Sequence, residues 1–285
     1  MYTLNCKGKL LVIDKPLIMG IINATPDSFY EGHLNKGIDG IMKIADKMID
    51  DGAEILDIGG QSTRPGSERI SVDEELKRVM PVVENIIKHH KDFIISVDTY
   101  HSKVAKEAVA AGVSIVNDIS SGMLDELMIE TVAALNVPYI CMHMQGTPET
   151  MQKNPHYENV IKDVLDFFIY KTDECKKAGI KDVIIDPGFG FGKTIQHNLQ
   201  LLKNLAVFSM LEKPILAGLS RKSFLYKTAG TQADGALTST IAANTIALMN
   251  SAAILRVHDV KEAKEIINLY NEYKKAPGHS PQRLY

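Results

Sequence analysis

The chain has 285 residues, of which 45% are hydrophobic and 24% charged, proportions typical of a folded globular protein. Its formal net charge of −3 gives no overall field that would gather nucleic acid or an anionic membrane, so we expect neither as a partner. Three cysteines argue against a disulfide framework, and the chain shows no secretory signal and no apolar run of roughly 18 residues. We therefore expect a soluble, cytoplasmic protein.

Eight short apolar runs rich in β-branched residues recur along the chain. Each is almost continuously hydrophobic rather than alternating, which is typical of strands buried on both faces of a parallel sheet. Segments with helical spacing of apolar residues separate them, for example residues 37–52, 72–90 and 159–179. The eight runs cover residues 17–25, 54–60, 93–99, 114–120, 138–144, 182–188, 214–220 and 253–258.

The regular succession of strand and helix predicts a parallel sheet. Eight such units without a change of pattern favour a closed barrel over an open doubly wound sheet. Residues 1–16 precede the first unit, and residues 8–14 (GKLLVID) could form a short hairpin strand across the bottom of the barrel. We therefore predict a single α/β domain over residues 1–285, a (β/α)8 TIM barrel with a short N-terminal extension.

Polar residues concentrate at the C-terminal ends of the predicted strands, which converge on one mouth of such a barrel. One such residue is more often a helix cap or a satisfied structural group than a ligand, but here they follow nearly every strand. Carboxylates and amides suit the edge of a heterocycle, and cations suit a phosphate or carboxylate. The first kind includes Asp98, Asn117 and Asp186, and the second Arg64, Arg221, Lys222, Arg256 and His258. The sequence predicts a ligand with a polar ring and an anionic end.

The glycine-rich segment 186–194 (DPGFGFGKT) invites a phosphate-loop interpretation, but the spacing does not fit. Pro187 stands where the P-loop pattern needs glycine, and glycines spaced evenly by two do not match the dinucleotide-binding pattern. A loop passing close to a flat ligand and a simple strand-to-helix turn remain equally open. We expect Lys193 to face solvent outside the site, and His143 to be a structural hydrogen-bonding residue.

At these same positions, and over nearly the whole chain, the sequence resembles the dihydropteroate synthases, a pterin-binding family. The resemblance implies a transferase of folate biosynthesis that condenses 6-hydroxymethyl-7,8-dihydropterin diphosphate with 4-aminobenzoate. The products would be 7,8-dihydropteroate and diphosphate, and sulfonamides would compete with 4-aminobenzoate. The segments that carry it, in order, are 19–32 (MGIINATPDSFYEG), 57–67 (DIGGQSTRPGS), 96–99 (SVDT), 116–120 (VNDIS), 143–157 (HMQGTPETMQKNPHY), 186–193 (DPGFGFGK), 219–224 (LSRKSF) and 256–260 (RVHDV).

The resemblance also implies roles for individual residues. It places the pterin against Asp98, Asn117, Ile119, Met142, Asp186, Gly218 and Lys222. It places the diphosphate against Asn23, Thr63, Arg256 and His258, with Asn23 also a ligand of Mg²⁺. It places 4-aminobenzoate against Phe29, Thr63, Arg64, Pro65, Phe191, Lys222 and Ser223. The implied catalytic residues are Asp27, Lys222, Arg256 and His258.

Two other interpretations keep the same barrel. One is a pterin-binding methyltransferase domain that takes a methyl group from methyltetrahydrofolate; the segments SRKS (220–223) and RVHDV (256–260) favour the synthase. The other is a catalytically silent paralogue, which should have lost residues of the anion site or the loops. The predicted helix over residues 238–255 is apolar around much of its surface, so it either forms a homodimer face, as in the family, or packs on the barrel.

Overall fold

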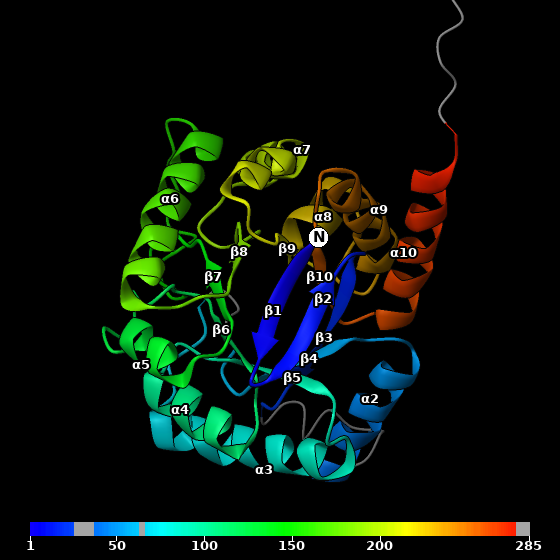
Figure 1. Ribbon diagram of the computed structural model, residues 1–285. Coiled ribbons are helices and arrows are strands. Elements are labelled where there is room, and N and C mark those ends of the chain that lie inside the picture. Colours follow the sequence, from blue (N-terminus) through cyan, green and yellow to red (C-terminus); the bar gives the residue numbers. More distant parts are fainter. Residues whose placement is uncertain (26–36, 63–65, 278–285) are drawn as a thin grey trace, which may run out of the picture.

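Eight parallel strands form one barrel in the computed structural model, which describes residues 1–25, 37–62 and 66–277 (Figure 1). The hydrogen-bonded order is β8-β7-β6-β5-β4-β3-β10-β9, and a bridge between Ile185 and Ile215 joins the two ends of this series. The predicted closed barrel and its eight strands are therefore confirmed. The strands are β3 (Leu17–Asn23), β4 (Ile55–Gly59), β5 (Ile94–Asp98), β6 (Ile115–Asp118), β7 (Tyr139–Met142), β8 (Val183–Asp186), β9 (Leu216–Ala217) and β10 (Ile254–Val257).

Helices cover the outside of the barrel, and the three predicted from their spacing are present as α2, α3 and α6. Gly112 and Gly179 occupy the C-cap positions of α4 and α6 at positive φ, as expected of glycine there. The described helices are α2 (Ile38–Asp50), α3 (Val72–His89), α4 (Ser102–Ala111), α5 (Met128–Leu135), α6 (Val160–Ala178), α7 (Ile195–Lys203), the 3-10 helix η1 (Leu205–Leu211), α8 (Ser223–Thr228), α9 (Ala236–Met249) and α10 (Val260–Lys275). None of them is both long and apolar enough to cross a membrane.

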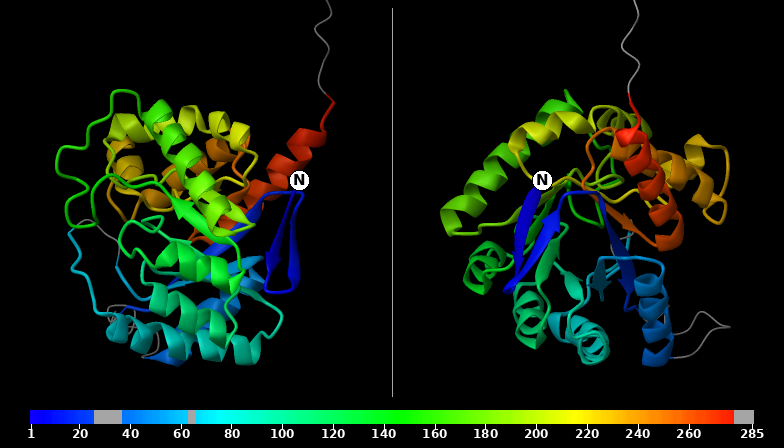
Figure 2. Two further views of the ribbon diagram at one scale, coloured as in Figure 1. Left: turned by 60° about the vertical axis from the view of Figure 1, so that its left-hand side comes forward. Right: turned by 45° about the vertical axis from the view of Figure 1, so that its right-hand side comes forward.

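The N-terminal extension is an antiparallel hairpin of β1 (Tyr2–Cys6) and β2 (Lys9–Ile13) at one end of the barrel (Figure 2). Its buried residues Leu4, Cys6, Leu11 and Ile13 pack with buried side chains from seven of the barrel strands, including Met19. The predicted hairpin is thus confirmed as a cover for the bottom of the barrel. The opposite end, where the strands finish, stays available for polar side chains.

Candidate active site

A pocket lies at the mouth of the barrel, where the C-terminal ends of the strands converge. All seven residues that the sequence assigned to pterin line this pocket. They come from distant parts of the chain and meet because parallel strands all end on the same side of a barrel. The lining residues are Asp98, Asn117, Ile119, Met142, Asp186, Gly188, Phe189, Phe191, Gly218, Lys222 and Arg256.

Arg256 holds the acidic side of the pocket together. Its Nε lies 2.6 Å from Asp57 Oδ2, and its Nη2 lies 2.6 Å from Asp98 Oδ2. Asn117 Nδ2 donates to the same Asp57 oxygen at 2.9 Å. Burial raises the pKa of Asp98 to about 7, and the Arg256 charge limits this rise. Asp57 therefore orients both an arginine and an amide of the pocket.

Asp186 presents one carboxylate oxygen to the pocket and uses the other in the loop. Its Oδ1 accepts the Gly188 N–H at 2.8 Å, which fixes the plane of the carboxylate. A β-carbon at Gly218 would come within 3.6 Å of Asp186 Oδ2, so the missing side chain leaves that oxygen accessible. Burial raises the pKa of Asp186, while the Gly188 hydrogen bond and Lys222 act against this.

Lys222 lines the pocket beside Phe191. It is the N-cap residue of α8, and its Nζ lies 4.2 Å from the centre of the Phe191 ring, within cation–π range. Burial lowers the pKa of Lys222 to about 8, and the neighbouring Arg256 charge adds to the effect. Its ammonium therefore lies against an aromatic ring, and the Asp186 and Asp98 carboxylates favour its charged form.

Two of the five side chains expected to bind an anion as cations, His258 and Arg221, are less able to do so than the sequence suggested. His258 Nδ1 lies 3.0 Å from the Ser220 hydroxyl, and burial followed by the Arg256 charge lowers the pKa of His258 to about 4. A neutral imidazole therefore stands where a positive charge was expected. Arg221 places two guanidinium nitrogens on Asp259, at 2.6 and 3.1 Å, so that carboxylate already neutralises its charge.

The expectation that Lys193 faces solvent was wrong. Its side chain is only 3% exposed, and its Nζ lies 2.9 Å from His143 Nδ1 and 3.0 Å from each of the Gly188 and Phe191 carbonyl oxygens. The glycine-rich loop folds back over its own lysine, which sequence spacing alone does not reveal. His143 has the structural hydrogen-bonding role that the sequence suggested.

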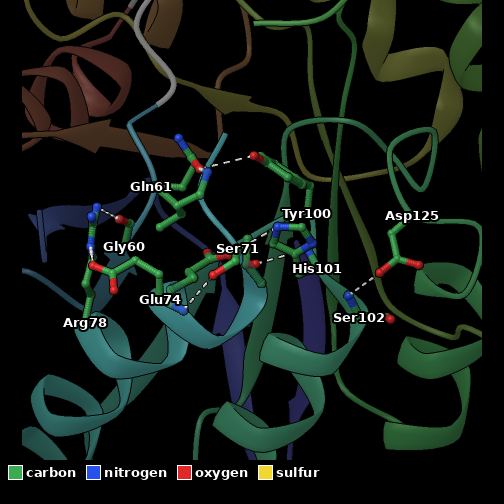
Figure 3. A network of polar contacts seen from close by, with 12 residues as sticks. Gly60, Gln61, Ser71, Glu74, Arg78, Tyr100, His101, Ser102 and Asp125 are labelled. Carbon is green, nitrogen blue, oxygen red and sulfur yellow. Dashed lines mark hydrogen bonds and ion pairs between the residues drawn. The ribbon is translucent and has the colours of Figure 1, made fainter. Parts of the chain in front are cut away.

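Gln61 ties together the base of the segment that follows β4, in a polar network shown in Figure 3. Its Nε2 donates to the Ser62 and Glu68 carbonyl oxygens at 2.8 and 2.9 Å. Its Oε1 accepts the Ile70 N–H at 2.8 Å and the Tyr100 hydroxyl at 3.2 Å. One side chain thus joins both ends of this segment to the end of β5. Sequence analysis missed Gln61, although a glutamine directly after a buried strand was a usable signal.

The remaining predicted residues lie apart from the pocket or outside the described part of the chain. Asn23 ends β3 with an exposed side chain, and Ser223, also exposed, is the first residue of α8. Neither residue is among those that line the pocket at the barrel mouth. The residues Asp27, Phe29, Thr63, Arg64 and Pro65 lie outside the described residues.

Within the described residues, no group of three or more histidine, cysteine, aspartate or glutamate side chains is placed to hold a metal ion. Asn23 offers a single exposed amide oxygen at the barrel mouth. Mg²⁺ prefers oxygen ligands and commonly keeps several waters beside one or two protein ligands and substrate phosphates. The residues present therefore fit an ion that arrives with an anionic substrate, and they do not form a closed cage.

Comparison with known proteins gives the family. Residues 19–258 match the family model described as pterin binding enzyme. The dihydropteroate synthase of Haemophilus influenzae is 44% identical over 269 residues, covering 94% of this chain and 97% of that protein. The chain belongs to the pterin-binding family of dihydropteroate synthases.

Solved structures agree with this assignment of the pterin-binding chain. A Yersinia pestis dihydropteroate synthase in complex with a sulfonamide drug superimposes with a TM-score of 0.91 at 39% identity, covering 96% of this chain and 100% of that one. A Xanthomonas albilineans dihydropteroate synthase in complex with 7,8-dihydropteroate gives a TM-score of 0.87 at 35% identity, covering 97% and 100%. These structures therefore resemble the chain in sequence as well as in fold, and they do so over nearly its whole length.

Proposed function

We propose that this chain is a dihydropteroate synthase, which joins 6-hydroxymethyl-7,8-dihydropterin diphosphate to 4-aminobenzoate and releases diphosphate. The observation that carries the proposal is the pocket at the barrel mouth, which combines two carboxylates, an amide, a lysine and an arginine. A flat heterocycle with alternating donors and acceptors needs this mixture of groups. The sequence relatives that bear the same name support it.

The pterin is recognised by the polar groups that line the pocket. Asp186 Oδ2 accepts ring N–H groups, while the Asn117 amide and Lys222 complete the edge. Ile119 and Met142, both buried, supply apolar faces for the ring. A ligand without matching donors would leave buried carboxylates unpaired, which is the basis of selectivity in such a site.

The diphosphate leaves from the methylene carbon as the bond to the amine forms. Donors from Arg256 and a neutral His258 stabilise the charge that develops on the leaving group. Mg²⁺ bound through Asn23 would add Lewis-acid stabilisation of the same charge. The amine of 4-aminobenzoate attacks from the outer side, where Lys222 and Phe191 stand together, and Ser223 lies next along the chain. Asp27, outside the described residues, is proposed to stabilise the cationic pterin.

The decisive experiment is incubation with the pterin diphosphate, 4-aminobenzoate and Mg²⁺, with detection of dihydropteroate by mass. The Lys222→Ala variant serves as the negative control, because removing this ammonium should lower turnover by about a hundredfold or more while the protein stays folded. A folded wild-type protein that forms no product would overturn the proposal. Methyl transfer from methyltetrahydrofolate in its place would identify the rival methyltransferase activity, and pterin binding without either reaction would identify a silent paralogue.

We propose Mg²⁺ as the cofactor, held through Asn23. In the Asn23→Ala variant, the increase in diphosphate affinity that Mg²⁺ produces should shrink by about tenfold, because the metal loses its one side-chain ligand. Titration calorimetry with inorganic diphosphate, with and without Mg²⁺, measures this increase directly. An unchanged effect of Mg²⁺ in the variant would remove Asn23 from the metal site.

We also propose a cytoplasmic homodimer. Helix α9 exposes Ile246 and Met249, and its neighbour α10 exposes Leu269 and Tyr273, so an apolar surface is available for a second copy. The three cysteines Cys6, Cys141 and Cys175 are free and buried, which suits a reducing compartment. Light scattering should give twice the chain mass of 31.5 kDa, and a mass of one chain would contradict the dimer.

A further inference from the structure

The glycine-rich loop after β8 carries two residues that the proposed function needs. It begins at Asp186, which faces the pterin pocket, and continues to Phe191, whose ring lies against Lys222. Two of its glycines have positive φ and no room for a side chain. A β-carbon at Gly188 would lie 1.9 Å from the His143 carbonyl oxygen, and one at Gly192 would lie 2.4 Å from the Gln145 carbonyl oxygen. The loop is therefore pressed directly against the segment after β7.

The carbonyl groups of this loop are bound by side chains rather than by regular secondary structure. Gln152 donates to the Gly190 oxygen at 2.6 Å, and Tyr157 donates to the Gly192 oxygen at 2.8 Å. Lys193 alone binds two of them, the Gly188 and Phe191 oxygens, each at 3.0 Å. A buried carbonyl without a partner is costly, so these side chains determine the loop conformation.

Lys193 also joins the loop to the neighbouring strand. Its Nζ lies 2.9 Å from His143 Nδ1 and 3.3 Å from the His143 carbonyl oxygen, directly after the end of β7. An ammonium has three protons, which match the three shorter contacts, and His143 Nδ1 must then accept. Met142, the residue before His143 and the last of β7, lines the pterin pocket, so one lysine connects the ends of β7 and β8 at the site.

This arrangement survives a change in the protonation of Lys193. Burial lowers the pKa of Lys193 to about 7, although Asp186 acts against it, and burial together with Lys193 keeps the pKa of His143 well below its ordinary value. A neutral amine would still donate to both loop carbonyls, because its lone pair could accept from His143 in the other tautomer. The two bonds to the loop are therefore present in either state.

We propose that Lys193 is a positioning residue that fixes the loop over residues 186–193 so that Phe191 stands against Lys222 as a wall of the 4-aminobenzoate subsite. This inference rests on the proposed function. The Phe191 carbonyl is bound directly by Lys193, whereas the Asp186 carboxylate accepts from the Gly188 N–H and belongs to the last residue of β8. Loss of Lys193 should therefore disturb the outer subsite more than the pterin pocket.

The test is the Lys193→Met variant, which keeps the apolar stem and removes the nitrogen. The KM for 4-aminobenzoate should rise about ten- to a hundredfold, and a sulfonamide inhibitor should weaken in parallel, while the KM for the pterin diphosphate changes less than about threefold. Lys171→Met is the matched control, because Lys171 is also buried but pairs with Glu174 on α6, at 2.7 Å. The control should leave both KM values unchanged.

A general loss of stability would lower the active fraction and leave both KM values near those of the wild type, and that result would overturn the inference. If Lys193→Met does not fold, Lys193→Gln keeps a donor nitrogen on a shorter side chain. It should show the same selective rise in the KM for 4-aminobenzoate, but a smaller one, and wild-type KM values in this variant would equally overturn the inference. An inactive wild-type protein would refute the proposed function instead. Hydrogen exchange then tests the loop separately, since Phe191 N–H donates to Gly188 O at 3.1 Å and should exchange faster in Lys193→Met than in Lys171→Met.

Discussion

Glu75, in the first turn of α3, is an ionisable side chain buried close to the site. It is 0% exposed, and neither carboxylate oxygen completes a well-formed hydrogen bond. His101 Nε2 approaches to 3.9 Å, the Thr99 hydroxyl and Arg78 favour its charge, and Asp98 opposes it. Burial outweighs the favourable groups and raises the pKa of Glu75 to about 7.

This shift predicts how stability varies with pH. Between the ordinary pKa of 4.5 and about 7 the folded protein binds more protons than the unfolded chain, so stability from Glu75 falls as pH rises through this window. The loss should reach up to about 3 kcal/mol by pH 8. Glu75→Gln should remove it, as measured by urea unfolding at pH 5 and pH 8. Glu74→Gln, next along α3 and partly exposed, is the matched control and should keep the wild-type dependence.

If Glu75→Gln retained the full pH dependence, the burial argument for this carboxyl would be wrong.

At the residue scale, the sequence could supply the identity of the site groups but not their protonation or burial. Residue types at strand ends identified the pocket groups, because position on a strand fixes the end of the barrel at which a side chain lies. The protonation of His258 and the burial of Lys193 depend on neighbours from other strands and loops, which the sequence does not order in space.

At the scale of elements, strands and helices were predictable because their signals are local. The apolar runs gave all eight barrel strands, although the run over residues 214–220 became a strand of only two residues, Leu216–Ala217. The rest of that run leaves the ladder: Ser220 turns to His258, and Arg221 adopts a positive φ of 55° while its N–H bonds to Thr240. The strand is therefore shorter than the apolar run predicts, and the residues after it make side-chain contacts near the site instead of ladder hydrogen bonds.

The segment after β4 illustrates an element whose conformation the sequence could not give. No sequence pattern indicated that Gln61 would bind the Ser62 and Glu68 carbonyls and the Ile70 N–H at once. These bonds join residues on either side of Gln61's own segment, and Tyr100, just after β5, donates to Gln61 as Figure 3 shows. The loop base is thus positioned by a side-chain network, which no local pattern encodes.

At the scale of the whole molecule, stability and chemistry occupy opposite ends of the barrel. The hairpin of β1 and β2 covers the bottom with a compact apolar cluster, and the pocket groups lie at the other end. In the hairpin, side chains alternate between the barrel and solvent: Leu4 is 2% exposed, whereas Leu10 is 68% exposed. This alternation provides a matched pair of leucines for testing the division.

Leu4→Ala should lower the free energy of unfolding by about 2 to 4 kcal/mol, because it opens a cavity beneath the barrel strands. Leu10→Ala should change it by less than about 0.5 kcal/mol, because that side chain is already in water. Urea unfolding measures both changes, and kcat and KM at a temperature where both variants are folded should match the wild type. Equal stability losses in the two variants would show that the hairpin does not pack as a cover. A selective loss of turnover in Leu4→Ala would show that the two ends of the barrel are coupled.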